Sequence, residues 1–157
     1  MTDYKEVKTN LFTINKGIDI PYCLAHCISS DFAMAGGIAL DFVRKWHMRN
    51  KLRWQYGNQE CEFTLGTILP IQVEDYGKST LVYNLVTKRY VYQQPDYANI
   101  IEVLRLMRED MLGRGLTKVA MPKIGCGIDG LEWTKVSEII QQVFNQTGIE
   151  VRVCHID

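Results

Sequence analysis

Residues 121–133 read Met121-Pro122-Lys123-Ile124-Gly125-Cys126-Gly127-Ile128-Asp129-Gly130-Leu131-Glu132-Trp133, a glycine-rich loop between two regular elements. The apolar run 116–121 before the loop predicts a strand, and the amphipathic pattern over 131–146 after it predicts a helix. Backbone N–H groups can converge on an anion at such a junction, because glycines permit an approach that side chains would block. The stretch therefore predicts an α/β fold that binds a phosphorylated ligand.

The spacing of the glycines in this loop limits the classes of ligand that it could bind. It lacks the Gly-x-Gly-x-x-Gly fingerprint of a first βα unit and the Gly-Lys-Ser/Thr ending of a triphosphate loop, which argues against NAD or ATP bound in those ways. Cys126 has no histidine nearby in the sequence, so we interpret it as a small packed residue rather than a nucleophile. Asp129 has two interpretations. It can cap the following helix together with Glu132, which the residues alone favour, or it can place a carboxylate at the rim of the anion site.

Strands and helices alternate along the rest of the chain. We expect strands over 4–8, 21–28, 67–73, 80–86, 116–121 and 149–153, and helices over 36–47, 48–56, from 95–96 onward and over 131–146. The turn 75–78 joins two of these strands as an antiparallel hairpin, which makes the sheet mixed. The alternation predicts helices on both faces of that sheet, with the ligand beyond the carboxyl ends of its strands.

Two further candidates stand at strand ends. Gly36 and Gly37 precede a helix and could present amides to a phosphate or ribose, although a simple turn explains them equally well. Lys88 follows the strand 80–86. A nucleophilic lysine needs burial or neighbouring cations to lose its charge, so the residues alone favour a solvated surface lysine.

Composition limits the function classes. The 157 residues carry 18 Lys plus Arg and 18 Asp plus Glu, and this net charge of zero argues against broad attraction to nucleic acid or membranes. No stretch approaches the roughly 20 apolar residues of a membrane span, and the N-terminus has no apolar signal core. Five scattered cysteines indicate free thiols in a reducing cytoplasm. Cys23, His26 and Cys27 lack a second ligand pair, so no metal is expected.

Four segments together resemble the macrodomain superfamily, which binds ADP-ribose, and within it the branch of terminal ADP-ribose protein glycohydrolase. They are 10–12, 25–29 with 34–39, 86–89, and 121–129 with Trp133. The resemblance covers nearly the whole chain. It implies an α/β fold of three layers, α/β/α, around a central mixed sheet, with residues 1–157 forming a single macrodomain.

The resemblance also implies roles for residues. Lys88 would attack the anomeric carbon of the distal ribose, and Asp129 would assist proton transfer and release. Leu11 would contact adenine, Ile156 the edge of the adenine pocket, and Ser29 the ribose side of the ligand. The full set of implied ligand-binding residues is Asn10, Leu11, Ser29, Gly36, Gly37, Ile38, Lys123, Ile124, Gly125, Cys126, Gly127, Ile128 and Ile156.

The implied activity is removal of terminal ADP-ribose from acidic side chains or similar acceptors, without a metal or cofactor. Two alternatives stay open: a module that binds ADP-ribose without turnover, and a phosphatase or deacetylase acting on ADP-ribose 1″-phosphate or O-acetyl-ADP-ribose. The expected partners are ADP-ribose and ADP-ribosylated proteins, with nucleic acid a partner only when ADP-ribosylated. We expect a cytoplasmic monomer, which in a eukaryote could also enter the nucleus.

Two departures from the family pattern matter. Asn10 stands where relatives commonly have an aspartate that accepts a hydrogen bond from the adenine amino group. Its carbonyl oxygen can still accept that bond without charge assistance, so adenine recognition is expected to weaken but persist. Ser29 stands where other macrodomains have paired asparagines. This favours the lysine-dependent branch.

Overall fold

The computed structural model describes residues 2–57, 65–126 and 129–156. The elements in chain order are β1 (Asp3–Lys8), a 3-10 turn (Leu11–Thr13), β2 (Cys23–Ser29), α1 (Gly37–Trp46), α2 (Met48–Tyr56), β3 (Thr67–Asp75), β4 (Lys78–Lys88), α3 (Tyr97–Arg114), β5 (Lys118–Met121), α4 (Trp133–Val143) and β6 (Glu150–His155). The expected alternation of strands and helices is confirmed, with boundaries moved by a few residues.

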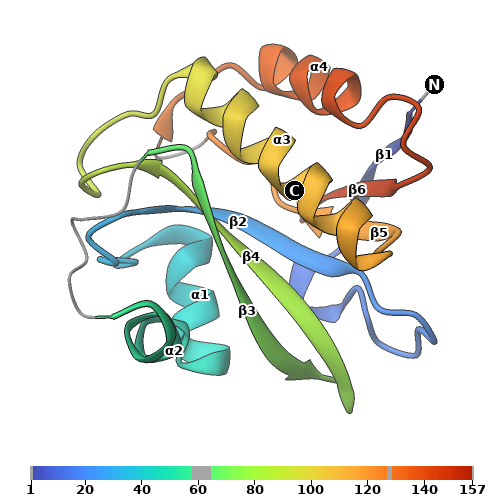
Figure 1. The fold of residues 1–157 in the computed structure, drawn as a ribbon, viewed down its shortest axis with the longest axis horizontal. Helices are drawn as coiled ribbons and strands as arrows, with labels where there is room; N and C mark the ends of the chain where they lie inside the picture. Colours follow the sequence, from blue (N-terminus) through green and yellow to red (C-terminus); the bar gives the residue numbers. More distant parts are fainter. Residues whose placement is uncertain (1, 58–64, 127–128, 157) are drawn as a thin grey trace.

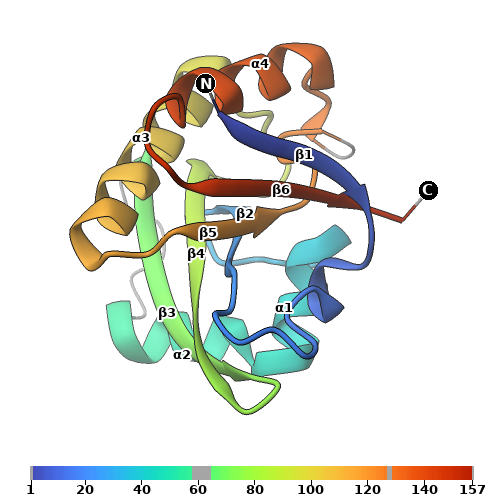
Figure 2. The same cartoon turned by 90° about the vertical axis from the view of Figure 1, so that its right-hand side faces the viewer.

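The strands form one mixed sheet in the order β1-β6-β5-β2-β4-β3. The pairs β1–β6, β6–β5, β5–β2 and β2–β4 are parallel, and β3 pairs antiparallel with β4 through the predicted hairpin. Figure 2 shows β1, β6 and β5 side by side, with the N-terminus entering at the β1 edge. Because β1, β2, β4, β5 and β6 are parallel, their carboxyl ends lie at the same edge of the sheet.

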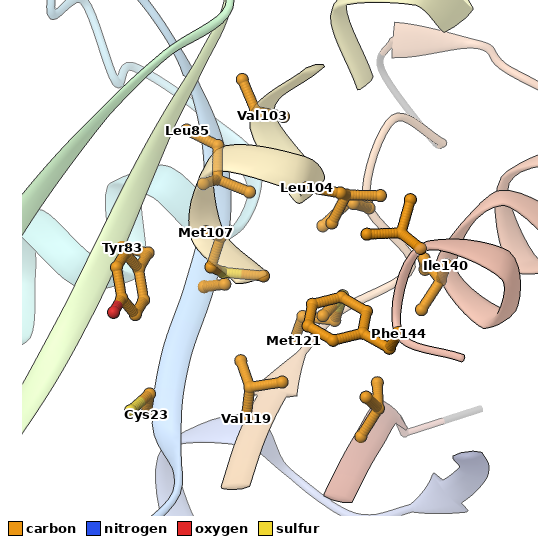
Figure 3. Packing of buried hydrophobic residues seen from close by; sticks show 14 of the residues in the cluster. Cys23, Tyr83, Leu85, Val103, Leu104, Met107, Val119, Met121, Ile140 and Phe144 are labelled. Atoms are coloured by element: carbon orange, nitrogen blue, oxygen red, sulfur yellow. The ribbon is translucent and has the colours of Figure 1, made fainter. Parts of the chain in front are cut away.

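Helices cover both faces of the sheet. Figure 1 shows α1 and α2 on one face and α3 and α4 on the other. Each face has its own apolar core: Phe42 and Leu52 pack with one cluster, and Met107 and Ile140 with the other. In Figure 3, side chains of α3 and α4 gather over Val119 and Met121 of β5. Burying one such side chain stabilises the fold by roughly 1.5–3 kcal/mol. Because both faces of the sheet are apolar, helices cover both of them, which gives the three-layer α/β/α arrangement expected from the sequence.

Two of the helices begin a few residues later than the sequence pattern predicts. The helix expected from 95–96 onward begins at Tyr97, and Asp96 is its N-cap residue: the carboxylate accepts a hydrogen bond of 2.8 Å from the backbone N–H of Asn99. The helix expected from residue 131 begins instead at Trp133, after Glu132 as the N-cap residue. No helix within residues 2–57, 65–126 and 129–156 is long and apolar enough to cross a membrane.

His26 on β2 lies fully buried beneath α1. Its ring stacks on Phe42 with ring centroids 3.9 Å apart, and its Nε2 lies 2.6 Å from Oδ1 of Asn84. Burial lowers the pKa of His26 from 6.5 to about 4, and the hydrogen bond with Asn84 opposes this only in part. The folded protein therefore holds a neutral imidazole over a pH range in which the unfolded chain binds a proton.

We expect this imidazole to make stability depend on pH. The unfolded state binds the extra proton below pH 6.5, so stability falls from there until pH is near 4, by about 3 kcal/mol in total. Denaturant unfolding at pH 7 and pH 4 measures the difference. The variant His26→Gln should lose this part of the pH dependence. The exposed His47→Asn variant should keep it, and equal slopes in both variants would contradict the assignment.

Candidate functional site

The predicted site residues follow the carboxyl ends of the parallel strands. Segment 9–12 follows β1, segment 29–38 follows β2, and residues 88–91 lie at the end of β4. Segment 122–126 with Asp129 follows β5, and Ile156 follows β6. In a parallel sheet these ends form the edge where ligands bind. The topology therefore brings together segments from both halves of the chain.

A bulge adjusts the register where β2 meets β4. Ile28 pairs with Val86, but Ser29 pairs with Lys88 rather than Thr87. An extra residue in one strand re-aims the side chains that follow it. Ser29 and Lys88 consequently lie side by side at the strand ends.

The side chains of Lys88 and Asp129, 41 residues apart in the sequence, meet at this edge. Nζ of Lys88 lies 2.5 Å from Oδ1 of Asp129 and donates a second hydrogen bond of 2.9 Å to the carbonyl oxygen of Val91. The two side chains are only 9% and 14% exposed. Lys88 is therefore not the solvated surface lysine that the residues alone favoured. An amine and a carboxylate in contact can exchange a proton directly.

These two groups line a cavity of about 350 Å³. Its walls also include Ser29, the start of α1 at 36–39, and the loop 122–126. Gly36 is the N-cap residue of α1 and has no side chain to cap the first N–H groups of the helix. Free N–H groups at a helix start attract anions. The cavity thus combines an anion-binding wall with an amine–carboxylate pair.

A second cavity of about 550 Å³ adjoins the first and shares Ile38, Pro122, Lys123 and Cys126 with it. Its other walls include the segment 9–12 and Ile156. Leu11 is 4% exposed and Ile156 is 74% exposed. Because they share wall residues, the two cavities form one cleft, with Lys88 and Asp129 at one end and Leu11 and Ile156 at the other.

Nearly all the residues expected in the site line one of the two cavities. The first cavity holds Lys88, Asp129, Ser29, Gly36, Gly37, Ile38, Lys123, Ile124, Gly125 and Cys126, and the second holds Asn10, Leu11 and Ile156. Gly127 and Ile128 lie outside the described residues. The roles assigned to these residues remain predictions.

The structure answers the two interpretations of Asp129. The prediction that it caps the helix is wrong, because Glu132 occupies the N-cap position of α4 without a capping side-chain bond. The backbone N–H of Glu132 donates instead to the hydroxyl of Tyr97, at 3.0 Å. The carboxylate of Asp129 faces Lys88.

Asn10 uses its side chain locally. Its Oδ1 accepts a hydrogen bond of 2.9 Å from the backbone N–H of Phe12, which caps the 3-10 turn. A carbonyl oxygen has two lone pairs, so one remains for a ligand.

The thiols near the cleft are poor nucleophiles. Burial raises the pKa of Cys27 to about 12, and burial also raises the pKa of Cys126. Both are therefore thiols at neutral pH, in keeping with our interpretation of Cys126 as a packed residue.

The segment 23–27 offers no metal site. Cys23 and Cys27 pack toward the core under α3, whereas His26 stacks on Phe42 of α1 on the opposite face of the sheet. Successive residues of a strand point to opposite faces, so this spacing separates the three side chains. Among the residues that the structure describes, no three His, Cys, Asp or Glu side chains gather as a metal site.

Sequence reasoning missed Val91, Asp31 and Arg49. Val91 lines the first cavity and supplies the carbonyl that holds Lys88. Asp31 and Arg49 bind the loop after β2 through backbone groups. No sequence motif predicts such contacts, because they depend on the position of a backbone atom in another segment of the chain.

Comparisons with known proteins give the relatives of the chain. The Macro domain family matches residues 25–140. The chain is 35% identical over 130 residues, 83% of this chain and 79% of the relative, to the human (Homo sapiens) ADP-ribose glycohydrolase OARD1. It is 26% identical over 148 residues, 88% of this chain and 91% of the relative, to the ADP-ribose 1″-phosphate phosphatase of Lodderomyces elongisporus. The macrodomain of Mycobacterium tuberculosis DarG superposes with a TM-score of 0.83 at 20% identity, over 98% of this chain and 97% of that one.

Proposed function

The chain belongs to the Macro domain family, and from that premise we propose that it is a hydrolase that releases ADP-ribose from acidic side chains of modified proteins. The observation that carries this proposal is the contact of 2.5 Å between Lys88 and Asp129 inside a ligand-sized cavity. A relative of similar length, the human ADP-ribose glycohydrolase, supports the activity.

In the proposed complex ADP-ribose lies along the cleft, with its adenine in the second cavity and its distal ribose in the first. The adenine would enter the second cavity, where Leu11 and Ile156 contribute apolar side chains to the wall. The diphosphate would lie across the residues that both cavities share and near the first N–H groups of α1. The distal ribose would then reach Lys88, with the acceptor beyond it.

The proposed reaction begins with a proton transfer from Nζ of Lys88 to Asp129, which leaves an uncharged amine. The amine attacks the anomeric carbon of the distal ribose, and the bond from that carbon to the acceptor oxygen breaks. Asp129 gives its proton to the departing carboxylate, and then takes one from the nitrogen that now holds the sugar. The transfers between the amine and the carboxylate use the short path between these two side chains, and the departing carboxylate receives its proton from Asp129 directly.

Water completes the cycle. A water molecule attacks the same carbon while Asp129 returns a proton to Nζ, and the carbon–nitrogen bond breaks. One proton of the bound water passes to Asp129, and the other stays on the oxygen. ADP-ribose therefore leaves with a new hydroxyl group on that carbon. Lys88 and Asp129 end in the state in which the amine first attacked.

A binding module would have no need for this pair. Burial of a charged amine is costly unless a partner compensates it. Amides of α1 and the loop 122–126 are sufficient to hold a diphosphate without it. The buried pair at the ribose end therefore favours catalysis over binding alone.

The direct test is incubation with a protein ADP-ribosylated on glutamate. We expect free ADP-ribose to appear with multiple turnovers. Calorimetry with ADP-ribose should show binding to the same protein. Binding without release from any ADP-ribosyl substrate would overturn the enzymatic proposal and favour a binding module.

ADP-ribose 1″-phosphate and O-acetyl-ADP-ribose belong in the same experiment. The similarity to the ADP-ribose 1″-phosphate phosphatase makes the phosphorylated compound a specific second candidate substrate. We expect the glutamate ester to be turned over with the higher kcat/KM. A higher value for the phosphate would assign a phosphatase instead.

The loop 122–126 can be tested through Gly125. This glycine has φ of +72°, and a Cβ there would lie 2.9 Å from Cδ1 of Leu131. Gly115 at the end of α3 has the same φ, with nothing within 4 Å of a Cβ. Alanine at either position should cost about 1–2 kcal/mol of stability from the left-handed backbone.

Of the two variants, we expect Gly125→Ala to weaken ADP-ribose binding, by about tenfold or 1.4 kcal/mol, because the new Cβ pushes the loop, which forms part of the wall of the first cavity, and the Leu131 side chain apart. Calorimetry on both variants measures this. Equal affinities for Gly125→Ala and Gly115→Ala would contradict a ligand role for the loop.

A further inference from the structure

Asp31 lies in the loop after β2 and ties two segments of the site together. Its Oδ1 accepts hydrogen bonds from the hydroxyl of Ser29, at 2.5 Å, and from the backbone N–H of Ala33, at 3.1 Å. Its Oδ2 accepts a bond of 3.2 Å from the backbone N–H of Val91. One carboxylate thus binds both its own loop and the segment that follows β4.

Val91 passes this connection on to Lys88. The carbonyl oxygen of Val91 accepts the bond of 2.9 Å from Nζ of Lys88, and Nζ also contacts Asp129. A continuous chain of hydrogen bonds therefore runs from Asp31 through Val91 and Lys88 to Asp129. The carbonyl fixes the rotation of the amino group about its bond to the side chain.

Backbone contacts reinforce the joint between the two segments. The N–H of Ser30 donates to the carbonyl of Lys88 at 2.9 Å, and the N–H of Asp31 donates to that of Arg89 at 3.1 Å. The hydroxyl of Ser30 also donates to the carbonyl of Arg89, at 3.0 Å. The two segments are thus joined by backbone groups and by the Ser30 hydroxyl, and the carboxylate of Asp31 joins them again at Val91.

The loop after β2 is held in a strained shape. Phe32 and Met34 have φ of +53° and +44°, a region that residues other than glycine seldom adopt. The guanidinium group of Arg49 donates to the carbonyl of Phe32 at 2.9 Å and also bonds the carbonyl of Ala33. Two charged side chains, Asp31 and Arg49, therefore hold a loop whose continuation, 34–38, lines the first cavity.

We propose that Asp31 is a positioning residue. It fixes Val91, whose carbonyl oxygen orients the amino group of Lys88 toward the distal ribose. Because Asp31 belongs to the loop after β2, the loop that lines the first cavity also orients the lysine. This inference rests on the proposed glycohydrolase function. In the part of the chain that the structure describes, Asp31 lines neither cavity. It acts through Val91 and not on the substrate itself.

The variant Asp31→Asn tests the proposal with little change in size. An amide cannot accept at both positions, so its NH₂ group faces either the N–H of Val91 or the donors at Ser29 and Ala33. We expect kcat to fall by about tenfold, the scale of one lost charge-assisted hydrogen bond. KM and the affinity for ADP-ribose should change much less. Asp19→Asn is the matched control, because that side chain is fully exposed.

A purely structural role would give a different pattern. Asp31→Asn would then lower the free energy of unfolding and leave the kcat of the folded protein unchanged, and that result would overturn the proposal. A raised KM with unchanged kcat would do the same. Absence of turnover in the wild-type protein would instead overturn the proposed function.

A second readout does not require turnover. An amine-reactive ester labels exposed lysines, and peptide mass spectrometry gives the rate at Lys88 relative to that at the exposed Lys135. We expect Lys88 to be labelled several-fold faster in Asp31→Asn than in the wild type, because a displaced Val91 carbonyl leaves Asp129 as the partner that holds the amino group. An unchanged relative rate would overturn the positioning role, whatever the enzyme assay shows.

Discussion

Replacing Lys88 by alanine should abolish release of ADP-ribose from modified protein while ADP-ribose still binds. Without the amine no covalent bond to the distal ribose can form, and loss of such a nucleophile lowers kcat by a factor on the order of 10⁴ or more. The cavity walls that would hold adenine and diphosphate come from other segments and remain. Rates of release and calorimetry with ADP-ribose measure the two effects separately.

Lys88→Arg distinguishes nucleophilic attack from simple charge. Arginine keeps a positive charge beside Asp129 but does not lose its proton in proteins. We therefore expect it to be as inactive as alanine. The control is Lys135→Ala, whose side chain is 60% exposed on α4 and which should retain full activity. Substantial activity in either Lys88 variant would contradict the nucleophilic role.

Replacing Asp129 by asparagine should lower kcat by about 10²–10⁴-fold, the usual contribution of a general acid–base group. Asparagine fills the same space and can still accept a hydrogen bond from Lys88, but it cannot take up the proton. Binding of ADP-ribose should be little affected. Rates at saturating substrate measure this loss.

The double variant Lys88→Ala/Asp129→Asn tests whether the two residues act as a unit. In the proposed reaction Asp129 moves protons only in steps that need the Lys88 amine, so the double variant should be no slower than Lys88→Ala alone. Losses that multiply would mean that Asp129 acts on the substrate independently of the lysine. That outcome would contradict the proton path between the two side chains.

The fold follows from patterns that operate within short stretches. Apolar runs such as 116–121 and amphipathic runs such as 131–146 set the order of strands and helices, and the turn at 75–78 sets the hairpin. The rule that ligands lie beyond the carboxyl ends of parallel strands then brings the glycine-rich loop and the Gly36–Gly37 turn to one edge. These features could be predicted because each depends on residues close in sequence.

The chemistry of the site depends on contacts between distant segments. Lys88 ends a strand like many exposed lysines, and its burial goes with partners from two other segments, the Val91 carbonyl and the Asp129 carboxylate. The helix-cap interpretation of Asp129 failed for the same reason, since a local capping pattern cannot reveal a lysine 41 residues away. The family resemblance predicted this pair where the residues alone did not.

Neither the sequence patterns nor the family resemblance predicted a role for Asp31. Its partners are a neighbouring hydroxyl and the backbone N–H groups of Ala33 and Val91. Any residue other than proline can supply a backbone N–H group, so the residue types at 33 and 91 do not reveal these contacts. Such a role can be found only after the two segments have been placed in space.

The central claim is that Nζ of Lys88 forms a bond to the distal ribose. The most direct measurement is peptide mapping by mass spectrometry after acid quenching, with wild type stopped during its first turnover and Asp129→Asn after longer incubation with glutamate-ADP-ribosylated protein. We predict one ADP-ribose attached at Lys88, and none when Lys88→Arg is treated in the same way. Release of ADP-ribose while Lys88 stays unmodified at every time point, or a bond at another residue, would contradict the account.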